Sequence, residues 1–329
     1  MTRFTTAFIP AFTRLAAATA LLASATVAHA QALKLGHIVP PTHVWHQVSE
    51  KIAADLGTAT GGKMKVAVSP LQKLGNEAQM INLMQAGAQQ LGVFTVGGLS
   101  NREESLLGWS LPYVFKDVAH ASRAAATPAA QDMLKRLDQH GLVGLGYTFA
   151  GMRHVLSLQP VTSAKDLANK KVRSFPSPIY NDWWTANGAA PTAMPLSEVA
   201  PSLTTKLLDA VDVDLDALVG LKFHQQAPHL TLTNHMAFPA VIVASKKWWA
   251  ALSDADRATV TKVIKEAETW GYKTAIDADV NNLAKAKADG AKVIAFDIKS
   301  FQAVGGQVRD KYTAKNPLIA DFYKQAQGL

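Results

Sequence analysis

The sequence predicts an α/β protein of two domains that share one long helix. Short apolar runs alternate with longer helical patterns, which is typical of βαβ units around largely parallel sheets. The 329-residue chain, less an N-terminal leader, leaves about 300 residues, enough for two domains with separate cores. Between Ala255 and Asp289 there is no proline, and about 35 helical residues would extend roughly 50 Å, further than one such domain.

The first half of the chain predicts alternating strands and helices. Trp45, Val48, Ile52 and Leu56 recur at helical spacing, and a Gly61-Gly62 pair ends that helix. We predict strands at 34–39, 64–68 and 91–95, helices at 77–86 and 118–126, an irregular connection over 97–112, and a segment from 142 to 147 that begins to cross between domains.

The second half repeats the theme and ends in the long helix. We predict strands at 155–158, 171–173, 190–194 and 211–215, and helices at 163–167, 178–187 and 197–207. Ser253 is placed to cap the long helix, with Asp256 three residues later, and Gly290 is placed to end it.

The first thirty residues have the pattern of a secretory signal peptide. Arg3 and Arg14 precede an apolar run, Leu15–Ser24, and Ala28-His29-Ala30 offers small residues for cleavage. A membrane anchor is the alternative, but the run is shorter than the roughly 20 residues that span a bilayer. We expect a signal peptide over 1–30 and a mature chain in the periplasm.

Composition narrows the function classes. The chain has no cysteine, which removes disulfides and thiolate metal sites. Without the two leader arginines, 31 basic residues face 25 acidic ones, with no Lys/Arg-rich block. This surplus suits an anionic ligand and gives little reason to expect nucleic acid.

An exported hydrolase or lyase is a second functional hypothesis. No Gly-x-Ser-x-Gly motif is present. His37, His43 and His46 lie close enough in sequence to suggest zinc, but no His-Glu-x-x-His motif accompanies them. We therefore predict a receptor rather than an enzyme, with no cofactor and no metal.

Two arginines are the leading site candidates. Arg173 ends a predicted strand, and its planar guanidinium can grip a carboxylate by two parallel hydrogen bonds. Its position alone allows equally a surface pair with Asp166. Arg153 follows Gly151 at the predicted domain crossing, where it could touch a ligand or fasten the hinge.

The mature chain resembles the DctP-type solute-binding proteins of TRAP transporters. The residues that carry the resemblance are Lys34–Val39, Leu74–Glu77, Leu111–Phe115, Gly151–Arg153, Asp166–Arg173, Pro191–Val199, Ala210–Asp212, Lys222–Phe223 and Leu232–His235. The resemblance implies a periplasmic-binding-protein (clam-shell) fold with hinge strands, closing on a small organic acid that is passed to membrane permease subunits. It implies a mostly monomeric protein, with dimers as exceptions. An ABC-type receptor is the alternative, against which the single late helix and the Arg173 segment argue.

The resemblance also implies domain bounds and site residues. Domain I would comprise 31–150 plus 239–278, and domain II 151–238 plus 279–329. Arg173 would hold the ligand carboxylate and Arg153 would contact the ligand or support Arg173. The other implied cleft residues are Leu196 and Phe149 as apolar walls and Glu77 and Thr95 as polar contacts. Each of these four could instead serve loop capping or core packing.

One segment departs from the family pattern. Where relatives commonly have Asp-Gly-Gln-Glu-Asn-Pro, this chain has Asp212–Gly220, and Asp216 stands where a neutral Asn is usual. A carboxylate there would repel a second ligand carboxylate, so we expect a monocarboxylate, hydroxylated or aromatic, rather than a C4-dicarboxylate. Asp216 could instead pair with an arginine and have no ligand role, and Asp214 is an alternative contact.

Overall fold

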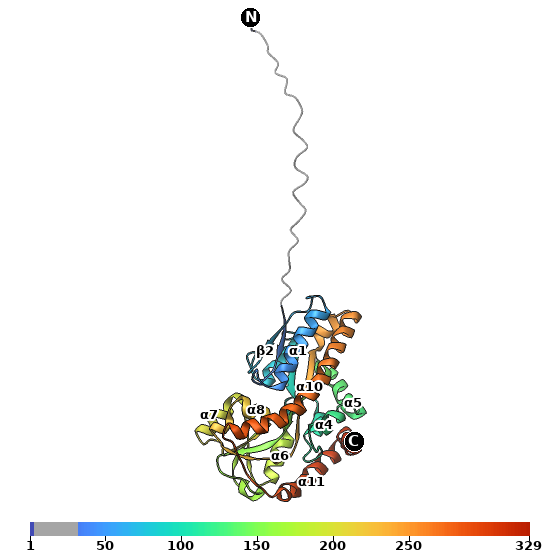
Figure 1. The fold of residues 1–329 in the computed structure, drawn as a ribbon. Helices are drawn as coiled ribbons and strands as arrows, with labels where there is room; N and C mark the ends of the chain where they lie inside the picture. The colour runs from blue at the N-terminus through green and yellow to red at the C-terminus, as the bar shows by residue number, and fades with distance from the viewer. Residues whose placement is uncertain (3–31) are drawn as a thin grey trace. The chain divides into compact units, whose positions relative to one another are not determined.

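Two mixed β-sheets organise the part of the chain that this computed structural model describes, residues 1–2 and 32–329 (Figure 1). All but two residues of the predicted signal peptide lie outside the described residues. The first sheet has the order β2 (Val66–Ser69), β1 (Leu33–Gly36), β3 (Leu91–Thr95), β10 (Ala237–Ser245), β4 (Leu142–Met152). The second has the order β11 (Lys292–Val293), β9 (His229–Thr231), β5 (His154–Ser157), β8 (Ala210–Val213), β6 (Lys171–Ser174), β7 (Ala190–Ala193).

The parallel strand pairs join predicted strands, except for the pair of β9 and β11. Strand β1 runs parallel to β2 and β3, and β6 runs parallel to β7 and β8. Strand β10 is antiparallel to both of its neighbours, β3 and β4, and β5 is antiparallel to both of its neighbours, β8 and β9. The α/β two-sheet fold predicted from the sequence is confirmed, with each sheet mixed rather than wholly parallel.

Helices surround both sheets. Their bounds are α1 (Val44–Ala59), α2 (Glu77–Ala86), α3 (Val96–Leu99), α4 (Val118–Ala124), α5 (Pro128–Arg136), α6 (Pro178–Ala186), α7 (Val199–Thr204), α8 (Leu215–Gly220), α9 (Lys246–Ala251), α10 (Asp254–Ala288), α11 (Ile298–Lys315) and α12 (Pro317–Gln327). The 3-10 helices are η1 (Glu104–Ser110), η2 (Leu137–His140), η3 (Ala164–Leu167), η4 (Leu196–Glu198) and η5 (Phe223–Gln225). Among the described residues, no helix is long and apolar enough to cross a membrane.

Helix α10 is the long helix that the sequence predicts, 35 residues capped by Ser253. The Ser253 side chain accepts a hydrogen bond from the Asp256 amide at 3.1 Å. The helix packs against α1 and β4 and, further along, against α8 (Figure 1). A side chain at Gly271 would come within 2.8 Å of Val48 on α1, so this glycine permits the close approach of the two helices.

The chain passes between the sheets at the end of β4. Gly151 there has φ 140°, a backbone conformation that favours glycine, and a side chain at this position would meet the Asp279 carboxylate at 2.7 Å. The 142–147 crossing segment of the sequence prediction is therefore the start of an 11-residue strand.

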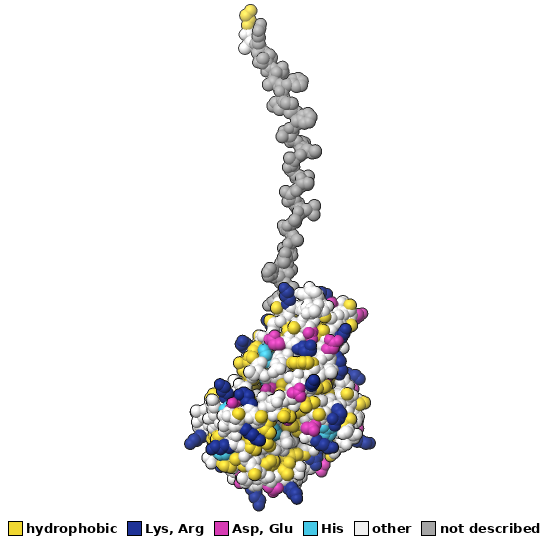
Figure 2. Space-filling view, in the orientation of Figure 1, with side chains coloured by type: hydrophobic (Ala, Val, Ile, Leu, Met, Phe, Trp, Pro, Cys, Tyr) yellow, Lys and Arg dark blue, Asp and Glu magenta, His cyan; other side chains and the backbone are white. Residues whose placement is uncertain are grey.

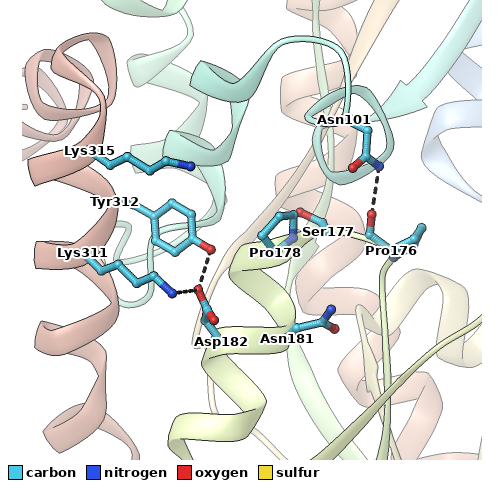
Figure 3. A pocket seen from close by; sticks show the side chains of 9 residues that line it. All are labelled: Asn101, Pro176, Ser177, Pro178, Asn181, Asp182, Lys311, Tyr312 and Lys315. Carbon is cyan, nitrogen blue, oxygen red and sulfur yellow. Dashed lines mark hydrogen bonds and ion pairs between the residues drawn. The ribbon is translucent and has the colours of Figure 1, made fainter.

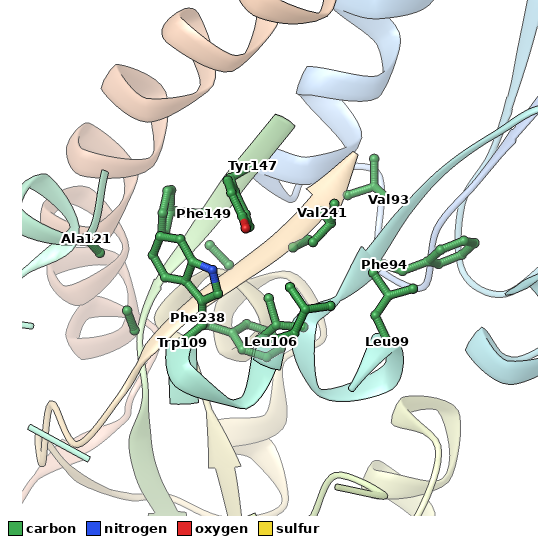
Figure 4. Close-up of a cluster of buried hydrophobic side chains, with 14 of the residues drawn as sticks. Val93, Phe94, Leu99, Leu106, Trp109, Ala121, Tyr147, Phe149, Phe238 and Val241 are labelled. Atoms are coloured by element: carbon green, nitrogen blue, oxygen red, sulfur yellow. The ribbon is translucent and has the colours of Figure 1, made fainter. Parts of the chain in front are cut away.

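The larger hydrophobic core lies around the first sheet (Figure 4). Trp109 of η1 is fully buried in this core, and its ring centroid lies 4.8 Å from that of Tyr147 on β4 and 4.6 Å from that of Phe322 on α12. A smaller core, including Leu156, Leu218 and Phe223, packs under the second sheet. Outside the cores, Lys and Arg side chains are spread among acidic ones on the face shown in Figure 2.

Candidate ligand-binding site

A cavity of about 250 Å³ opens at the C-terminal ends of β6 and β7. Ligands in open α/β sheets commonly bind at this edge of parallel strands. Its volume is just below the range of about 300–1,000 Å³ typical of small-molecule sites, which suits a small ligand. The lining residues are Ile38, Gln72, Asn76, Glu77, Ala78, Arg173, Phe175, Pro176, Ala193, Met194, Pro195 and Leu196. Three of the sequence-predicted site residues are therefore among them.

Arg173 is a buried cation in the wall of this cavity. Its side chain is only 2% exposed, and Nε and Nη2 donate to the Met194 carbonyl at 3.3 and 3.2 Å. Within residues 32–329 it forms no ion pair with a carboxylate. Burial lowers the pKa of Arg173 to about 10, and the positive charge of Arg153 contributes to this decrease. The guanidinium therefore stays protonated at neutral pH. A buried charge without a counter-ion is costly, and an anion in the cavity would relieve that cost.

Glu77 adds a half-buried carboxylate to the same wall. It is the first residue of α2, which Asn76 caps in a reciprocal bond with Gln79. Its Oε2 accepts a hydrogen bond from Thr95 Oγ1 at 2.8 Å and its Oε1 accepts from the Thr95 amide. Burial raises the pKa of Glu77 to about 7, against the opposing effects of the Thr95 hydrogen bonds and of Arg173.

Thr95 does not line the cavity. It is fully buried, and its hydroxyl also accepts from the Gly98 amide at 2.8 Å, which caps α3. Its place is behind Glu77, where it holds the carboxylate. The structure thus places Thr95 as a support for a cavity residue.

Arg153 lies in a different, fully buried cluster of charges. Its guanidinium forms ion pairs with Asp212 and, at 3.0 Å, with Asp214, and donates to the Asp212 carbonyl. Asp212 also contacts His235 Nε2 at 3.2 Å. Burial alone would raise the pKa of Asp212, but Arg153 and His235 lower it to about 2. We refer to Arg153, Asp212, Asp214, Asp216, His43 and His235 as the Arg153 cluster.

Asp216 belongs to this cluster and does not line the cavity. Its Oδ2 accepts from the Val44 amide at 2.7 Å, at the first turn of α1, and its Oδ1 accepts from Asn282 Nδ2 at 3.1 Å. The carboxylate therefore caps α1 and ties it to α8 and α10. Phe149, also absent from the lining, is fully buried between the rings of Trp109 and Tyr272, at 5.7 and 5.5 Å.

Phe175 is a cavity residue that the sequence reasoning missed. Its ring centroid lies 4.1 Å from Cζ of Arg173. The two residues are two positions apart at the end of β6, and side chains at i and i+2 of a strand project to the same face. The spacing of Arg173 and Phe175 could therefore have indicated that both side chains face the cavity.

Two of the three clustered histidines contact each other, and the third has other partners. His37 Nε2 lies 3.0 Å from His46 Nδ1, while His43 Nδ1 accepts from the Trp45 amide at 3.1 Å and its Nε2 lies 3.5 Å from Asp214. Within the described ranges no group of three His, Cys, Asp or Glu side chains is arranged to hold a metal ion. Burial, reinforced by His46 and His43, lowers the pKa of His37 to about 3.

A larger hollow of about 520 Å³ lies between α6 and α11 (Figure 3). Its two lysines point inward from α11, but Lys311 Nζ bonds Asp182 at 2.7 Å and Lys315 pairs with Glu104. Asn101 Nδ2 donates to the Pro176 carbonyl at 2.9 Å, and Pro176 lines both hollows. Because its charges are already paired, this hollow is a weaker candidate for an acid than the Arg173 cavity.

Known proteins match this fold over most of the chain. The model of bacterial extracellular solute-binding protein family 7 matches residues 35–316. The 2,3-diketo-L-gulonate-binding periplasmic protein YiaO of Escherichia coli K12 is 30% identical, over 90% of this chain and 91% of its own. A TRAP periplasmic solute binding protein from Bradyrhizobium sp. BTAi1, in complex with α/β-D-galacturonate, superposes with a TM-score of 0.86 at 27% identity, covering 91% of this chain and 100% of the other. One from Polaromonas sp. JS666, bound to D-erythronate, gives a TM-score of 0.85 at 27% identity, covering 90% and 98%. The chain therefore belongs to solute-binding protein family 7, the DctP-type receptors of TRAP transporters, a family of transport receptors and not of enzymes.

Proposed function

We propose that this protein is a periplasmic TRAP receptor that binds a hydroxylated monocarboxylate through Arg173 and delivers it to the membrane permease. The observation that carries the proposal is the guanidinium of Arg173, which is 2% exposed, lines the cavity and forms no ion pair among the described residues. A ligand carboxylate would supply the missing counter-ion through charge-assisted hydrogen bonds.

The Glu77 carboxylate in the cavity wall supports a ligand with a single carboxylate. Glu77 shares the cavity wall with Arg173 and already takes two hydrogen bonds from Thr95, so it is held in place as an acceptor. Ligand hydroxyl groups can donate to it, whereas a second ligand carboxylate would be repelled by its ionised form. The ligands that the names of the three compared proteins state are all hydroxylated monocarboxylates. Glu77 thus takes over the selective role that the sequence assigned to Asp216.

Ligand capture would occur by closure of two lobes, 31–150 plus 239–278 and 151–238 plus 279–329. The cavity supports this view because its lining combines residues on both sides, such as Ile38 and Glu77 with Arg173 and Leu196. An acid that contacts both sides would shift the population towards a closed form. Export by the signal peptide over 1–30 would place the receptor beside its permease.

Calorimetric titration with four acids tests the proposal. We expect D-galacturonate or D-erythronate to bind more tightly than succinate or benzoate. Succinate binding more tightly than both hydroxylated acids would exclude the monocarboxylate preference, and benzoate binding more tightly would instead indicate an aromatic ligand. Binding of glucose, which lacks a carboxylate, as tightly as any acid would remove the role of Arg173 as anchor.

A further inference from the structure

Two buried guanidinium groups approach the aromatic ring of Phe175. The Cζ atom of Arg173 lies 4.1 Å from its ring centroid, and the Cζ atom of Arg153 lies 5.0 Å from it. Both distances are within the range of about 6 Å for cation–π attraction, which is stronger where water is excluded. The ring is 4% exposed and lines the ligand cavity.

The position of this ring is fixed from several sides. Its centroid lies 5.0 Å from that of Tyr180 and 5.2 Å from that of Phe238, whose ring also receives Arg153 at 4.1 Å. The Phe175 carbonyl accepts from the Ser177 amide at 2.7 Å. The ring is therefore a fixed surface against which a guanidinium can rest.

The two arginines depend on this surface to different degrees. Arg153 is held by Asp212 and Asp214, so its orientation does not require the ring. Arg173 has only the Met194 carbonyl as a hydrogen-bond partner in the described structure, bound through Nε and Nη2. Its Nη1 has no hydrogen-bond partner among the described residues, and the ring of Phe175 lies against the group at 4.1 Å from Cζ.

We propose that Phe175 is a positioning residue for ligand binding, which orients Arg173 by cation–π contact and partly offsets its uncompensated charge. This inference rests on the proposed function, because Phe175 can affect ligand affinity only if Arg173 binds the acid. A guanidinium can form two parallel hydrogen bonds to a carboxylate only when the two groups lie in the same plane. Loss of the ring should therefore weaken ligand binding, while Arg173 remains as the anchor.

Two measurements test this inference, one without ligand. In the NMR spectrum of protein labelled with ¹⁵N-arginine, the Arg173 Nε–H signal, assigned by its loss in Arg173→Lys, should be shifted upfield by the ring. The shift should vanish in Phe175→Leu. An unshifted signal in the wild type would overturn the proposal, whether or not any acid binds.

The second measurement changes the ring electronically at nearly constant size. Mono-, di- and trifluorinated phenylalanine at position 175 withdraw density from the ring face. Affinity for the tightest-binding acid among D-galacturonate, D-erythronate and succinate should fall stepwise, by roughly threefold to thirtyfold in total, the span of a cation–π contact. The same substitutions at Phe301, a buried ring that contacts Phe296, should leave affinity unchanged.

The outcomes separate the two proposals. Equal affinity across the fluorinated series at position 175 would assign Phe175 to packing alone and overturn its positioning role, while the proposed function would stand. Failure of all three acids to bind the wild type would refute the proposed function, and the Arg173 signal would still decide whether the ring orients the guanidinium.

Discussion

Arg153 and Arg173 are equally buried, at 2% exposure, but their surroundings differ in charge. Arg153 has two carboxylates, Asp212 and Asp214, whereas Arg173 has a carbonyl, an aromatic ring and a cavity. Breaking a buried ion pair is strongly destabilising, while an unpaired buried charge is itself a cost. We therefore propose that the first arrangement stabilises the fold and that the second is completed by an anionic ligand.

The largest expected effect is on folding stability at Arg153. Arg153→Met removes the buried cation that pairs with Asp212 and Asp214, so the free energy of unfolding should fall by about 3–5 kcal/mol. Urea unfolding measures it, with Arg173→Met as the matched control. That variant removes an unpaired cation and should be as stable as the wild type or more so. Equal destabilisation by the two variants would contradict the view that Arg153 stabilises the fold and Arg173 does not.

The two regions should also respond to pH with opposite sign. The pKa of Glu77 is raised from 4.5 to about 7, so the folded state holds this proton more tightly and stability declines as pH rises through that interval. The pKa of Asp212 is lowered from 3.8 to about 2, so its contribution is complete above 3.8 and is lost as pH falls towards 2. One proton accounts for at most about 1.4 kcal/mol per pH unit.

Paired variants isolate these two slopes. The stability difference between wild type and Glu77→Gln should change between pH 4.5 and 7 and be flat below that range. The difference between wild type and Asp212→Asn should change only below about pH 4. A flat profile for Glu77→Gln would mean that the carboxyl of Glu77 has an ordinary pKa in the folded protein, contrary to the description above.

The smallest effect is expected at Asp216. Asp216→Ala removes the side-chain acceptor for the Val44 amide and should cost about 1 kcal/mol, while Asp216→Asn keeps an acceptor and should cost less. Neither should alter the ranking of acids in the calorimetric panel. A gain in succinate affinity in Asp216→Asn would instead bring Asp216 into the ligand site and restore the role expected from the sequence.

The sequence predicted the elements that repeat a simple pattern. Helix α10, from its Ser253 cap, and α2, over 77–86, follow from capping residues and helical spacing. The segments 128–136, 215–220, 298–315 and 317–327 were not predicted as helices. At 211–215 a strand was expected throughout, but β8 ends at Val213 because Asp214 caps α8 and accepts from the Ala217 amide.

Because a strand was expected over 211–215, the direction of the nearby Asp216 side chain could not be predicted. The direction of the Asp216 side chain depends on whether it lies on a strand or in the first turn of a helix, and its partner Val44 is 172 positions away. Phe149 and Tyr147 share a face of β4, but periodicity cannot tell whether that face meets a cleft or a helix. Glu77, Arg173 and Leu196 line the cavity. Arg173 was expected there from its place at the end of a predicted strand, whereas Glu77 and Leu196 were expected from the family resemblance alone.

The most direct test of the central claim is the shift in melting temperature that an acid produces. The acid is the tightest binder of the panel, added at about 100 times its Kd, where binding contributes about 2.7 kcal/mol to stability. Wild type and Arg136→Met, a control at an exposed arginine, should be stabilised equally, and Arg173→Met should show no shift. Equal stabilisation of Arg173→Met would contradict the claim that a ligand carboxylate is the counter-ion of Arg173.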